Sequence, residues 1–280
     1  MAVKIIVDST FDMKPSVKQR VEIVPLTVLF GEEAYIDGVT IDHKVFYEKL
    51  VESDVLPTTS QATPGAFSDV FEKITSAGDS AVVLTISSKL SGTYQSACIA
   101  AQDYSGIYVV DSQSAAIGAG ILAELALDLA DQGLDGEAIA RTIETERENI
   151  CLIAMLDTLE YLKKGGRISK AVAFAGGLLS IKPVINLDHG EINILVKARG
   201  SKQGNNLLVQ EIEKFGGIDF QKPLLLGYTG LSDLLLQKYM EDSKALWQQG
   251  TDFVPYTIIG SVIGTHAGPG AIAAAFFRKS

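Results

Sequence analysis

An apolar, β-branched run that is followed at once by a hydroxyl-rich turn constrains this fold more than any other feature. The run covers residues 81–86, and the turn covers residues 87–97 with the sequence SSKLSGTYQSA. This predicts a buried strand, after which Gly92 lets the backbone turn tightly into a helix near Thr93. Free N–H groups at a helix start and nearby hydroxyls favour an anion, and parallel sheets bind ligands beyond the carboxyl ends of their strands. We therefore expect a small anionic group to bind here.

Residues 1–150 alternate between apolar, β-branched runs and segments with helical periodicity. Thr63 and Pro64 mark one helix start, as the N-cap and the first-turn residue. This alternation predicts a mainly parallel sheet with helices on both faces, an α/β/α sandwich. The expected strands are 3–7, one or two segments within 21–30 around Pro25, 81–86 and 107–110, and the expected helices are 42–53, 64–77, one from Thr93, and 115–131.

The pattern changes near residue 150, where we expect a domain boundary. Asp188-His189-Gly190 is a tight hairpin signal between strand runs at 181–187 and 191–197. A hairpin combined with helices predicts a mixed sheet. The fold class is therefore α/β with two domains: 1–150 with a mainly parallel sheet, and 151–280 with a mixed sheet and helices. The other elements expected after residue 150 are strands at 150–156, 223–227 and 252–258, and helices at 158–164, 205–215 and 233–247.

The composition is that of a globular protein, with 280 residues, 47 % hydrophobic and 21 % charged. The net charge of −10 argues against nucleic-acid binding, which depends on cationic contacts. No apolar run approaches the roughly 18 residues that span a bilayer, and Val3 begins a strand and not a leader, so we expect a soluble, cytoplasmic chain. Cys98 and Cys151 are expected to be small buried side chains, not a disulfide or a metal site.

Several polar or glycine-rich loops carry residue types that suit a binding site. Taken alone, each has an ordinary explanation in turn and cap chemistry. Thr59 and Ser60 then form a turn, Ser91 caps a helix, and His266 lies in a tight turn. The loops are Asp8-Ser9, residues 57–61, residues 87–96 and residues 265–270.

Taken together and in order, these segments resemble the DegV family. The resemblance covers essentially the whole chain, and its most specific segments are LSGTYQ at residues 90–95 and KGGRI at residues 164–168. The matching segments are, in order, Asp8-Ser9, Thr59-Ser60-Gln61, residues 90–97, Val110-Asp111-Ser112, residues 159–168, Ile181-Lys182-Pro183 and His266-x-Gly268-Pro269-Gly270.

The resemblance implies a protein that holds one long-chain fatty acid between two domains. Several members of the family serve as the lipid-binding subunit of bacterial fatty acid kinase. They present the carboxylate to a separate ATP-dependent subunit, which makes the acyl phosphate used in phospholipid metabolism. On this basis we expect a non-catalytic subunit without metal or cofactor. Its expected partners are a fatty acid and a kinase, with at most transient membrane contact.

The resemblance also assigns residues to the ligand site. The carboxylate-binding hydroxyls of the family match Thr59 and Ser91, and His266 completes the network. The expected site includes their neighbours, namely Ser60, Gly92 and Thr93. The family's basic strip in the second domain is usually richer than KARGSK at residues 197–202 here, which bears on docking of a kinase.

A fatty acid also suits these residue types on physical grounds. Burying a bare carboxylate costs several kcal/mol, whereas hydroxyls and a histidine can hydrogen-bond it and exchange protons. A tail of about 14 methylenes contributes roughly 11 kcal/mol gross at about 0.8 kcal/mol per CH₂. The candidate tail-lining segments are 171–179, whose small residues leave room, and 258–264. Ordinary core packing is the alternative for both.

Lys163, Lys164, Arg167 and Lys170 form a local basic cluster in an acidic chain. A solvated surface is the usual explanation for such a run. The two adjacent glycines and the family resemblance favour a functional role. We expect Arg167 to lie near the ligand mouth and to assist with the phosphate or the kinase partner.

Other patterns suggest alternative functions. GAGILA at residues 118–123 fits a dinucleotide fingerprint, but its glycines lie inside a predicted helix, and no acidic residue follows at the expected distance. Close helix packing explains them better, and without a P-loop we expect no ATP binding by this chain. A serine esterase or acyl hydrolase would use Ser91 as nucleophile and His266 as base, although no G-x-S-x-G elbow is present. A purely structural interaction protein is the third alternative.

Overall fold

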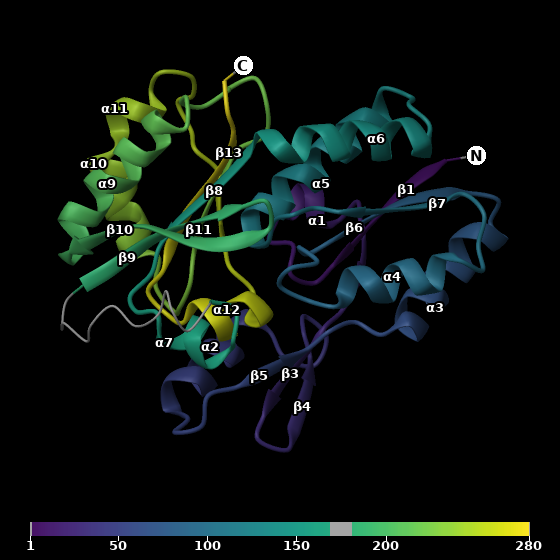
Figure 1. Cartoon of the computed structure of the whole chain (residues 1–280), viewed down its shortest axis with the longest axis horizontal. Helices are drawn as coiled ribbons and strands as arrows, with labels where there is room; N and C mark the ends of the chain where they lie inside the picture. The colour runs from purple at the N-terminus through teal and green to yellow at the C-terminus, as the bar shows by residue number, and fades with distance from the viewer. Residues whose placement is uncertain (1, 169–180, 280) are drawn as a thin grey trace.

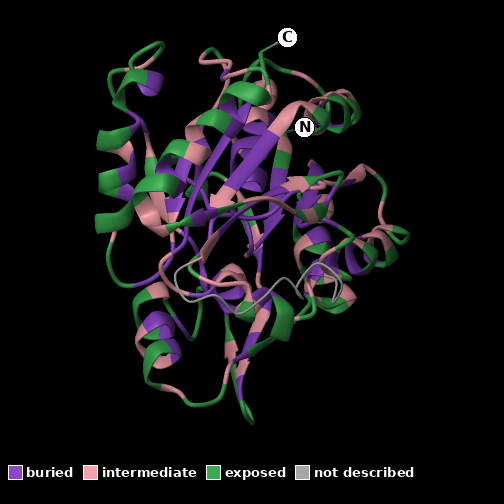
Figure 2. Cartoon of the chain, turned by 60° about the vertical axis from the view of Figure 1, so that its left-hand side comes forward, coloured by how far each residue is buried: buried purple, intermediate pink, exposed green. Residues whose placement is uncertain are grey.

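The computed structural model describes residues 2–168 and 181–279, and its α/β architecture confirms the expected fold class (Figure 1). The described residues form a four-stranded parallel sheet, a six-stranded mixed sheet and a small three-stranded antiparallel sheet. The strands are largely buried, and the helices turn exposed faces outward (Figure 2). Lys170 and the candidate tail-lining segment 171–179 lie outside the described residues.

The parallel sheet has the strand order β2-β1-β6-β7. Apolar residues make up most of its two central strands, as expected for strands that are buried on both faces. In register, Ile6 lies beside Val83 and Val7 beside Leu84. The strands are β1 (Val3–Asp8), β2 (Glu22–Val24), β6 (Ser80–Thr85) and β7 (Ile107–Asp111).

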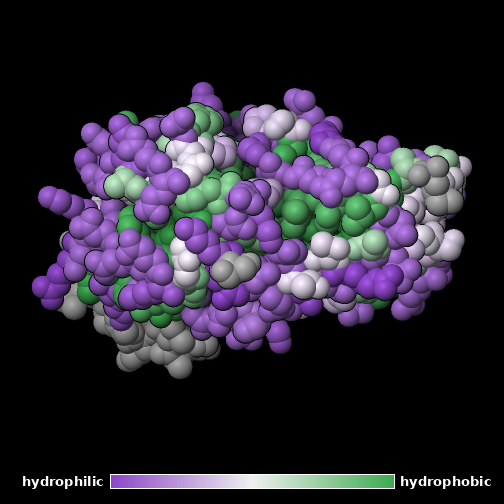
Figure 3. Space-filling view, turned by 90° about the horizontal axis from the view of Figure 1, so that it is seen from above, coloured by the Kyte–Doolittle hydropathy of each residue, from purple (hydrophilic) through white to green (hydrophobic). Residues whose placement is uncertain are grey.

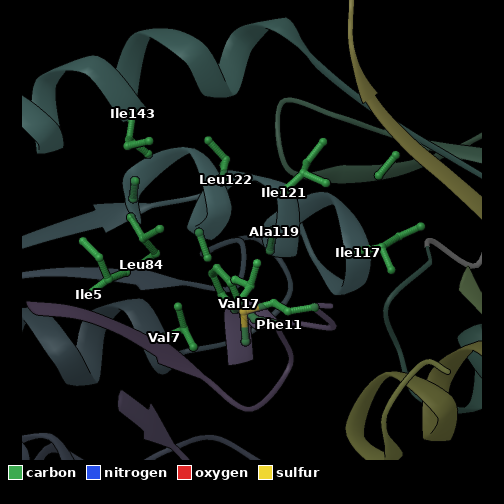
Figure 4. Close-up of a cluster of buried hydrophobic side chains, with 14 of the residues drawn as sticks. Ile5, Val7, Phe11, Val17, Leu84, Ile117, Ala119, Ile121, Leu122 and Ile143 are labelled. Atoms are coloured by element: carbon green, nitrogen blue, oxygen red, sulfur yellow. The ribbon is translucent and has the colours of Figure 1, made fainter. Parts of the chain in front are cut away.

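Helices cover both faces of this sheet, as the alternating pattern predicts. Successive strand residues point to opposite faces, so Ile5 and Leu84 pack in one apolar cluster with Ile143 (Figure 4), whereas Ile6 and Val83 pack in another. The first cluster contains residues of α5 and α6, and the second contains residues of α3 and α4. Their bounds are α3 (Pro64–Ser76), α4 (Thr93–Ala101), α5 (Ala116–Asp131) and α6 (Gly136–Glu146).

The six-stranded sheet has the order β10-β9-β8-β13-β11-β12. Its neighbours are antiparallel except for β11 and β12, so the sheet is mixed as expected. His189 and Gly190 both have positive φ at the predicted hairpin turn between β9 and β10. The strands are β8 (Ile150–Met155), β9 (Ile181–Asp188), β10 (Glu191–Arg199), β11 (Leu225–Tyr228), β12 (Tyr256–Ile258) and β13 (Ile272–Phe277).

The helices beside this sheet depart from the sequence expectations. The predicted helix 233–247 is two helices, α10 (Leu234–Asp242) and α11 (Lys244–Trp247), and Ser243 between them donates to the carbonyl of Tyr239. The helix expected at 205–215 begins earlier, as α9 (Gly200–Lys214). β13 and α6 were not expected from the sequence.

A third group of elements lies beside the other two sheets. Its antiparallel sheet has the order β4-β3-β5. The short helix α12 contacts α2, α7 and β5, so it joins segments that are far apart in sequence (Figure 1). The elements of this group are β3 (Thr27–Phe30), β4 (Glu33–Ile36), α2 (His43–Glu52), β5 (Thr58–Ser60), α7 (Glu160–Lys164) and α12 (Ser261–Ala267). Two short elements lie elsewhere: α1 (Pro15–Lys18) contacts α5, and the 3₁₀ turn η1 (Arg147–Asn149) contacts α6.

The glycines of GAGILA allow α5 to pack closely against its neighbours. A Cβ at Gly118 would lie 3.1 Å from Cβ of Leu152 on β8, and one at Gly120 would collide with the carbonyl oxygen of Asp12. Both glycines therefore have a packing role. This is the explanation that the sequence favours over a dinucleotide site.

The strands of the parallel sheet all precede residue 150, and those of the six-stranded sheet begin at it. One apolar cluster nevertheless includes Val7 from the first sheet and Leu152 and Phe277 from the second. We propose that residue 150 is the boundary between two domains, 1–150 and 151–280, which share this core through α5. Among the described residues, no helix combines the length and apolar character needed to cross a bilayer. Hydrophilic side chains cover most of the face seen in Figure 3.

Candidate functional site

A cavity of about 420 Å³ lies where elements of both sheets and of the small third sheet meet. This volume is within the range of about 300–1,000 Å³ that is usual for small-molecule sites. Most of its lining is apolar and comes from β8, β9, β13, α12 and the loops after β5 and β6. The polar side chains that line it are Thr59, Ser60, Gln61, Ser91, Arg167 and His266.

A hydrogen bond between β5 and α12 joins two polar residues of the cavity lining. Oγ1 of Thr59 lies 2.9 Å from Nε2 of His266, and the tautomer of the ring decides which of the two donates. Burial, and then the positive charge of Arg167, lower the pKa of His266 to about 4. The imidazole is therefore neutral at pH 7, and it can donate or accept one proton in a hydrogen bond with a ligand.

Gly165 joins this pair to Arg167. A Cβ at Gly165 would collide with Nδ1 of His266, so only glycine allows the ring to lie against the end of α7. Arg167 donates from Nη1 to the carbonyl of Gly165 at 2.6 Å and from Nε to the carbonyl of Leu90 at 3.1 Å. The guanidinium therefore ties the KGGRI segment to the loop that carries Ser91.

The loop after β6 places its hydroxyls through local hydrogen bonds. Oγ of Ser91 lies 2.9 Å from Oγ1 of Thr93 and accepts from the backbone N–H of Thr93 at 3.3 Å. A Cβ at Gly92 would collide with Oε1 of Gln61, whose amide donates to Oγ of Ser96 at 2.8 Å. Thr93 is fully buried and does not line the cavity, so its contribution is to orient Ser91.

The apolar part of the cavity depends on small side chains. Ala154 on β8 and Ala271 and Ala273 near the start of β13 line it, and each leaves volume that a larger residue would fill. Ile259, Val262 and Ile263 line it from the α12 side. The candidate tail-lining segment 258–264 thus contributes to the cavity wall.

A family model described as an uncharacterised protein of the DegV family matches residues 2–279. The chain belongs to the DegV family. A DegV domain-containing protein of Caldanaerobacter subterraneus subsp. tengcongensis is 34 % identical to it over 261 residues, which cover 92 % of this chain and 91 % of the relative. The resemblance seen in the sequence motifs is therefore confirmed.

Solved structures of fatty-acid-binding proteins share this fold over nearly their whole length. A DegV family protein from Thermus thermophilus, described for its fatty acid binding, has a TM-score of 0.88 and 30 % identity, with 99 % of this chain and 100 % of that chain covered. A stearic acid-binding protein from Eubacterium ventriosum has a TM-score of 0.88 and 29 % identity, with 100 % and 99 % covered.

The site residues expected from the DegV resemblance gather around this cavity. Six of the seven line it, and the seventh is Thr93, which lies behind Ser91. Sequence reasoning did not include Gln61, although the Thr-Ser-Gln motif contains it, or the alanines of β8 and β13. The run of small residues in AIAAAFF at residues 271–277 is the signal that would have found the alanines of β13.

The remaining basic residues of this DegV chain lie elsewhere. Lys163 and Lys164 are exposed on α7 and do not line the cavity, whereas Arg167 does. In the strip 197–202, Arg199 ends β10 and Lys202 lies on α9, both outside the cavity lining.

The arrangement differs from that of a serine hydrolase. Oγ of Ser91 is hydrogen-bonded to Thr93, while Nε2 of His266 faces Thr59. Among the described residues, Nδ1 of His266 has no hydrogen-bond partner, so no carboxylate orients the ring as a general base requires. The geometry instead provides neutral groups that can hydrogen-bond an acid.

Proposed function

We propose that this chain binds one long-chain fatty acid in the cavity and presents its carboxylate to a separate ATP-dependent kinase subunit, which forms the acyl phosphate. The observation that carries the binding half is a mostly apolar cavity whose lining includes the hydrogen-bonded pair Thr59–His266 and Arg167. Fatty acid binding by the DegV family protein from Thermus thermophilus and by the stearic acid-binding protein from Eubacterium ventriosum supports it.

The proposed carboxylate site consists of Thr59, Ser60, Ser91, Gly92, Arg167 and His266, with Thr93 orienting Ser91 from outside the lining. A carboxylate there accepts hydrogen bonds from hydroxyls and from the neutral imidazole, while the Arg167 guanidinium in the same lining is assigned to the phosphoryl group. These donors offset the cost of removing the carboxylate from water. At about 0.8 kcal/mol per buried CH₂, the alanine-lined part of the cavity provides the favourable term for the tail.

Part of the polar lining reaches the protein surface. Ser60, Gln61 and Gly92 line it and are exposed, whereas the alanines at 271 and 273 are buried. A carboxylate held beside the exposed residues is accessible to a second protein. This accessibility supports the role of a non-catalytic, lipid-presenting subunit. Because that partner would use ATP, we infer a cytoplasmic location.

Mass spectrometry of the purified protein, native and then in denaturing organic solvent, tests the binding half. We expect a mass increment that matches one fatty acid and is lost on denaturation. Thr59→Val should weaken retention about tenfold or more, because hydrogen bonds to charged groups contribute about 1.5–3 kcal/mol. Thr142→Val on α6, whose hydroxyl bonds only within its own helix, is the matched control and should retain the lipid.

Two outcomes would contradict the proposal. An increment that survives denaturation would indicate an acyl-enzyme and the hydrolase alternative with Ser91. No increment, together with no uptake of added oleate or palmitate, would leave the chain without the proposed ligand.

The presenting half is tested by adding a fatty acid kinase subunit and ATP to the lipid-loaded protein, and by comparing wild type with Arg167→Ala. The guanidinium has more N–H donors than its two carbonyl partners use, so it can also contact a phosphoryl oxygen. We expect acyl phosphate formation to fall while bound lipid is retained. Lys164→Ala, on the exposed face of α7, is the control. Unchanged turnover in Arg167→Ala would remove this role.

A further inference from the structure

A second cavity, of about 550 Å³, lies near the start of α12. Its lining comes from the loop after β1, from α1, from the turn before α2 and from β12, and it shares no residue with the first cavity. Phe11, Met13 and Ile258 give it apolar walls. Lys18 and Val39 also line it and are exposed, so they mark its mouth.

Two buried carboxylates line this second cavity. Asp12 is 6 % exposed and Asp37 is 4 % exposed. Oδ1 of Asp12 accepts from the backbone N–H of Gly260 at 2.8 Å. Among the described residues, Oδ2 of Asp12 and Oδ1 of Asp37 have no hydrogen-bond partner. Buried acceptors without partners are uncommon and costly, so these oxygens indicate a missing donor.

His43 completes the lining but supplies no positive charge at neutral pH. Burial lowers the pKa of its imidazole and raises the pKa of Asp12 and of Asp37. The charge of Asp37 raises the pKa of Asp12 further, whereas the hydroxyls of Ser9 and Ser261 partly offset the rise at Asp37. A Cβ at Gly260 would lie 3.1 Å from Oδ1 of Asp12 and 3.2 Å from Cε1 of His43, so these two side chains converge on one point. Lys18 at the mouth is the cation that lowers both carboxyl pKa values.

We propose that this second cavity binds a small organic cation, in which a primary ammonium group is attached to an apolar body. The ammonium N–H groups would donate to the unpartnered oxygens of Asp12 and Asp37, and the apolar body would lie against Phe11, Met13 and Ile258. An inorganic metal ion suits the site less well. The described residues contain no group of three His, Cys, Asp or Glu side chains arranged to hold one.

Isothermal titration calorimetry with phenethylamine as the probe tests this proposal. We expect saturable binding with one site per chain. 2-Phenylethanol, which has the same apolar body and no charge, should bind at least tenfold more weakly. Asp37→Asn should also weaken phenethylamine binding at least tenfold, because it removes the charge and keeps the shape. Ser91→Ala in the first cavity should leave phenethylamine binding unchanged.

A second variant keeps the test valid if Asp37→Asn does not fold. Val39 is 70 % exposed, so Val39→Trp at the mouth should fold normally and obstruct entry of the probe. The proposal is overturned if the wild-type protein shows no saturable binding of millimolar phenethylamine. It is equally overturned if phenethylamine binds Asp37→Asn and Val39→Trp as tightly as wild type. Neither result depends on whether the first cavity holds a fatty acid.

Discussion

The two cavities lie beside the same short helix, α12, and differ in the polar groups that line them. His266 near the end of α12 belongs to the first cavity, and Gly260 at its start is held by Asp12 of the second. Burial favours the neutral form of the titratable groups in both: it lowers the pKa of His266 and raises that of Asp12. The first cavity offers donors and a nearby guanidinium, whereas the second offers carboxylate oxygens.

Apolar area therefore does not distinguish the two sites, because both have apolar walls. What distinguishes the two sites is whether their polar groups can donate hydrogen bonds to a ligand or can only accept them. A site with hydroxyls, a neutral imidazole and Arg167 suits an acid, and a site with unpartnered carboxylate oxygens suits an ammonium group. Changes confined to one cavity should consequently alter one ligand class and leave the other unaffected.

The largest expected effect comes from Gly165→Ala. The new Cβ would collide with Nδ1 of His266, so the ring must move away from Thr59. We expect fatty acid affinity to fall about a hundredfold, which corresponds to about 2.7 kcal/mol. Titration of the lipid-free protein with oleate measures this change.

Gly65→Ala on α3 is the matched control for that substitution. Its Cβ would meet nothing closer than Oγ1 of Thr63 at 3.9 Å, so oleate affinity should stay at the wild-type value. Phenethylamine binding should be unchanged in both variants. If Gly165→Ala bound oleate normally, the position of His266 would not matter to binding in the first cavity. His266 would then no longer distinguish the first cavity from the second.

The first cavity was largely predictable from the sequence, and the second was not. Ser91 and His266 lie in segments that combine a turn signal with a family motif, so their role could be anticipated. Asp12, Asp37 and His43 are far apart in sequence, and each stands in ordinary loop or helix-start surroundings. Only the tertiary fold brings them to one cavity, since no local pattern encodes their burial.

The fold shows the same division between local and tertiary information. Strands 81–86 and 107–110 were predictable because β-branched runs alternate there with helical segments. β13 was not, because its sequence IAAAFF is rich in alanine, which is depleted in strands. It lies between β8 and β11 with every residue buried, so pairing with these neighbours outweighs the low strand propensity of alanine.

The second largest expected effect is a loss of about 2 kcal/mol in the free energy of unfolding at low pH, and it depends on His266. The pKa of His266 is about 4 in the folded chain and about 6.5 when unfolded, so the unfolded state binds more protons between these values. Stability from His266 is complete above pH 6.5 and is lost as the pH falls toward 4. From pH 7 to pH 5, wild type should lose about 2 kcal/mol more free energy of unfolding than His266→Gln.

Urea denaturation of both proteins at the two pH values measures this difference. Asp8 acts in the opposite direction, because burial raises its pKa to about 6 and the folded state then binds more protons. Comparing wild type with His266→Gln cancels that contribution, which both proteins share. Equal losses in the two proteins would mean that His266 is not held neutral, and the donor character of the first cavity would have to be assigned to its hydroxyls alone.

The smallest expected effect, about 1 kcal/mol in the free energy of unfolding, comes from substitutions of Asp12 in the second cavity. They separate its role as a hydrogen-bond acceptor from its role as a buried charge. Asp12→Ala leaves the backbone N–H of Gly260 without an acceptor and should lower the free energy of unfolding by about 1 kcal/mol.

Asp12→Asn keeps an acceptor oxygen and removes the buried charge. Because the folded-state pKa of Asp12 is raised, the stability linked to its protonated form is present at low pH and lost as the pH rises. Asp12→Asn should therefore gain stability relative to wild type as the pH increases, measured by urea denaturation without amine. A variant as unstable as Asp12→Ala at every pH would instead mean that the ionised carboxylate itself supports α12, and the second cavity would then need no ligand to balance its charge.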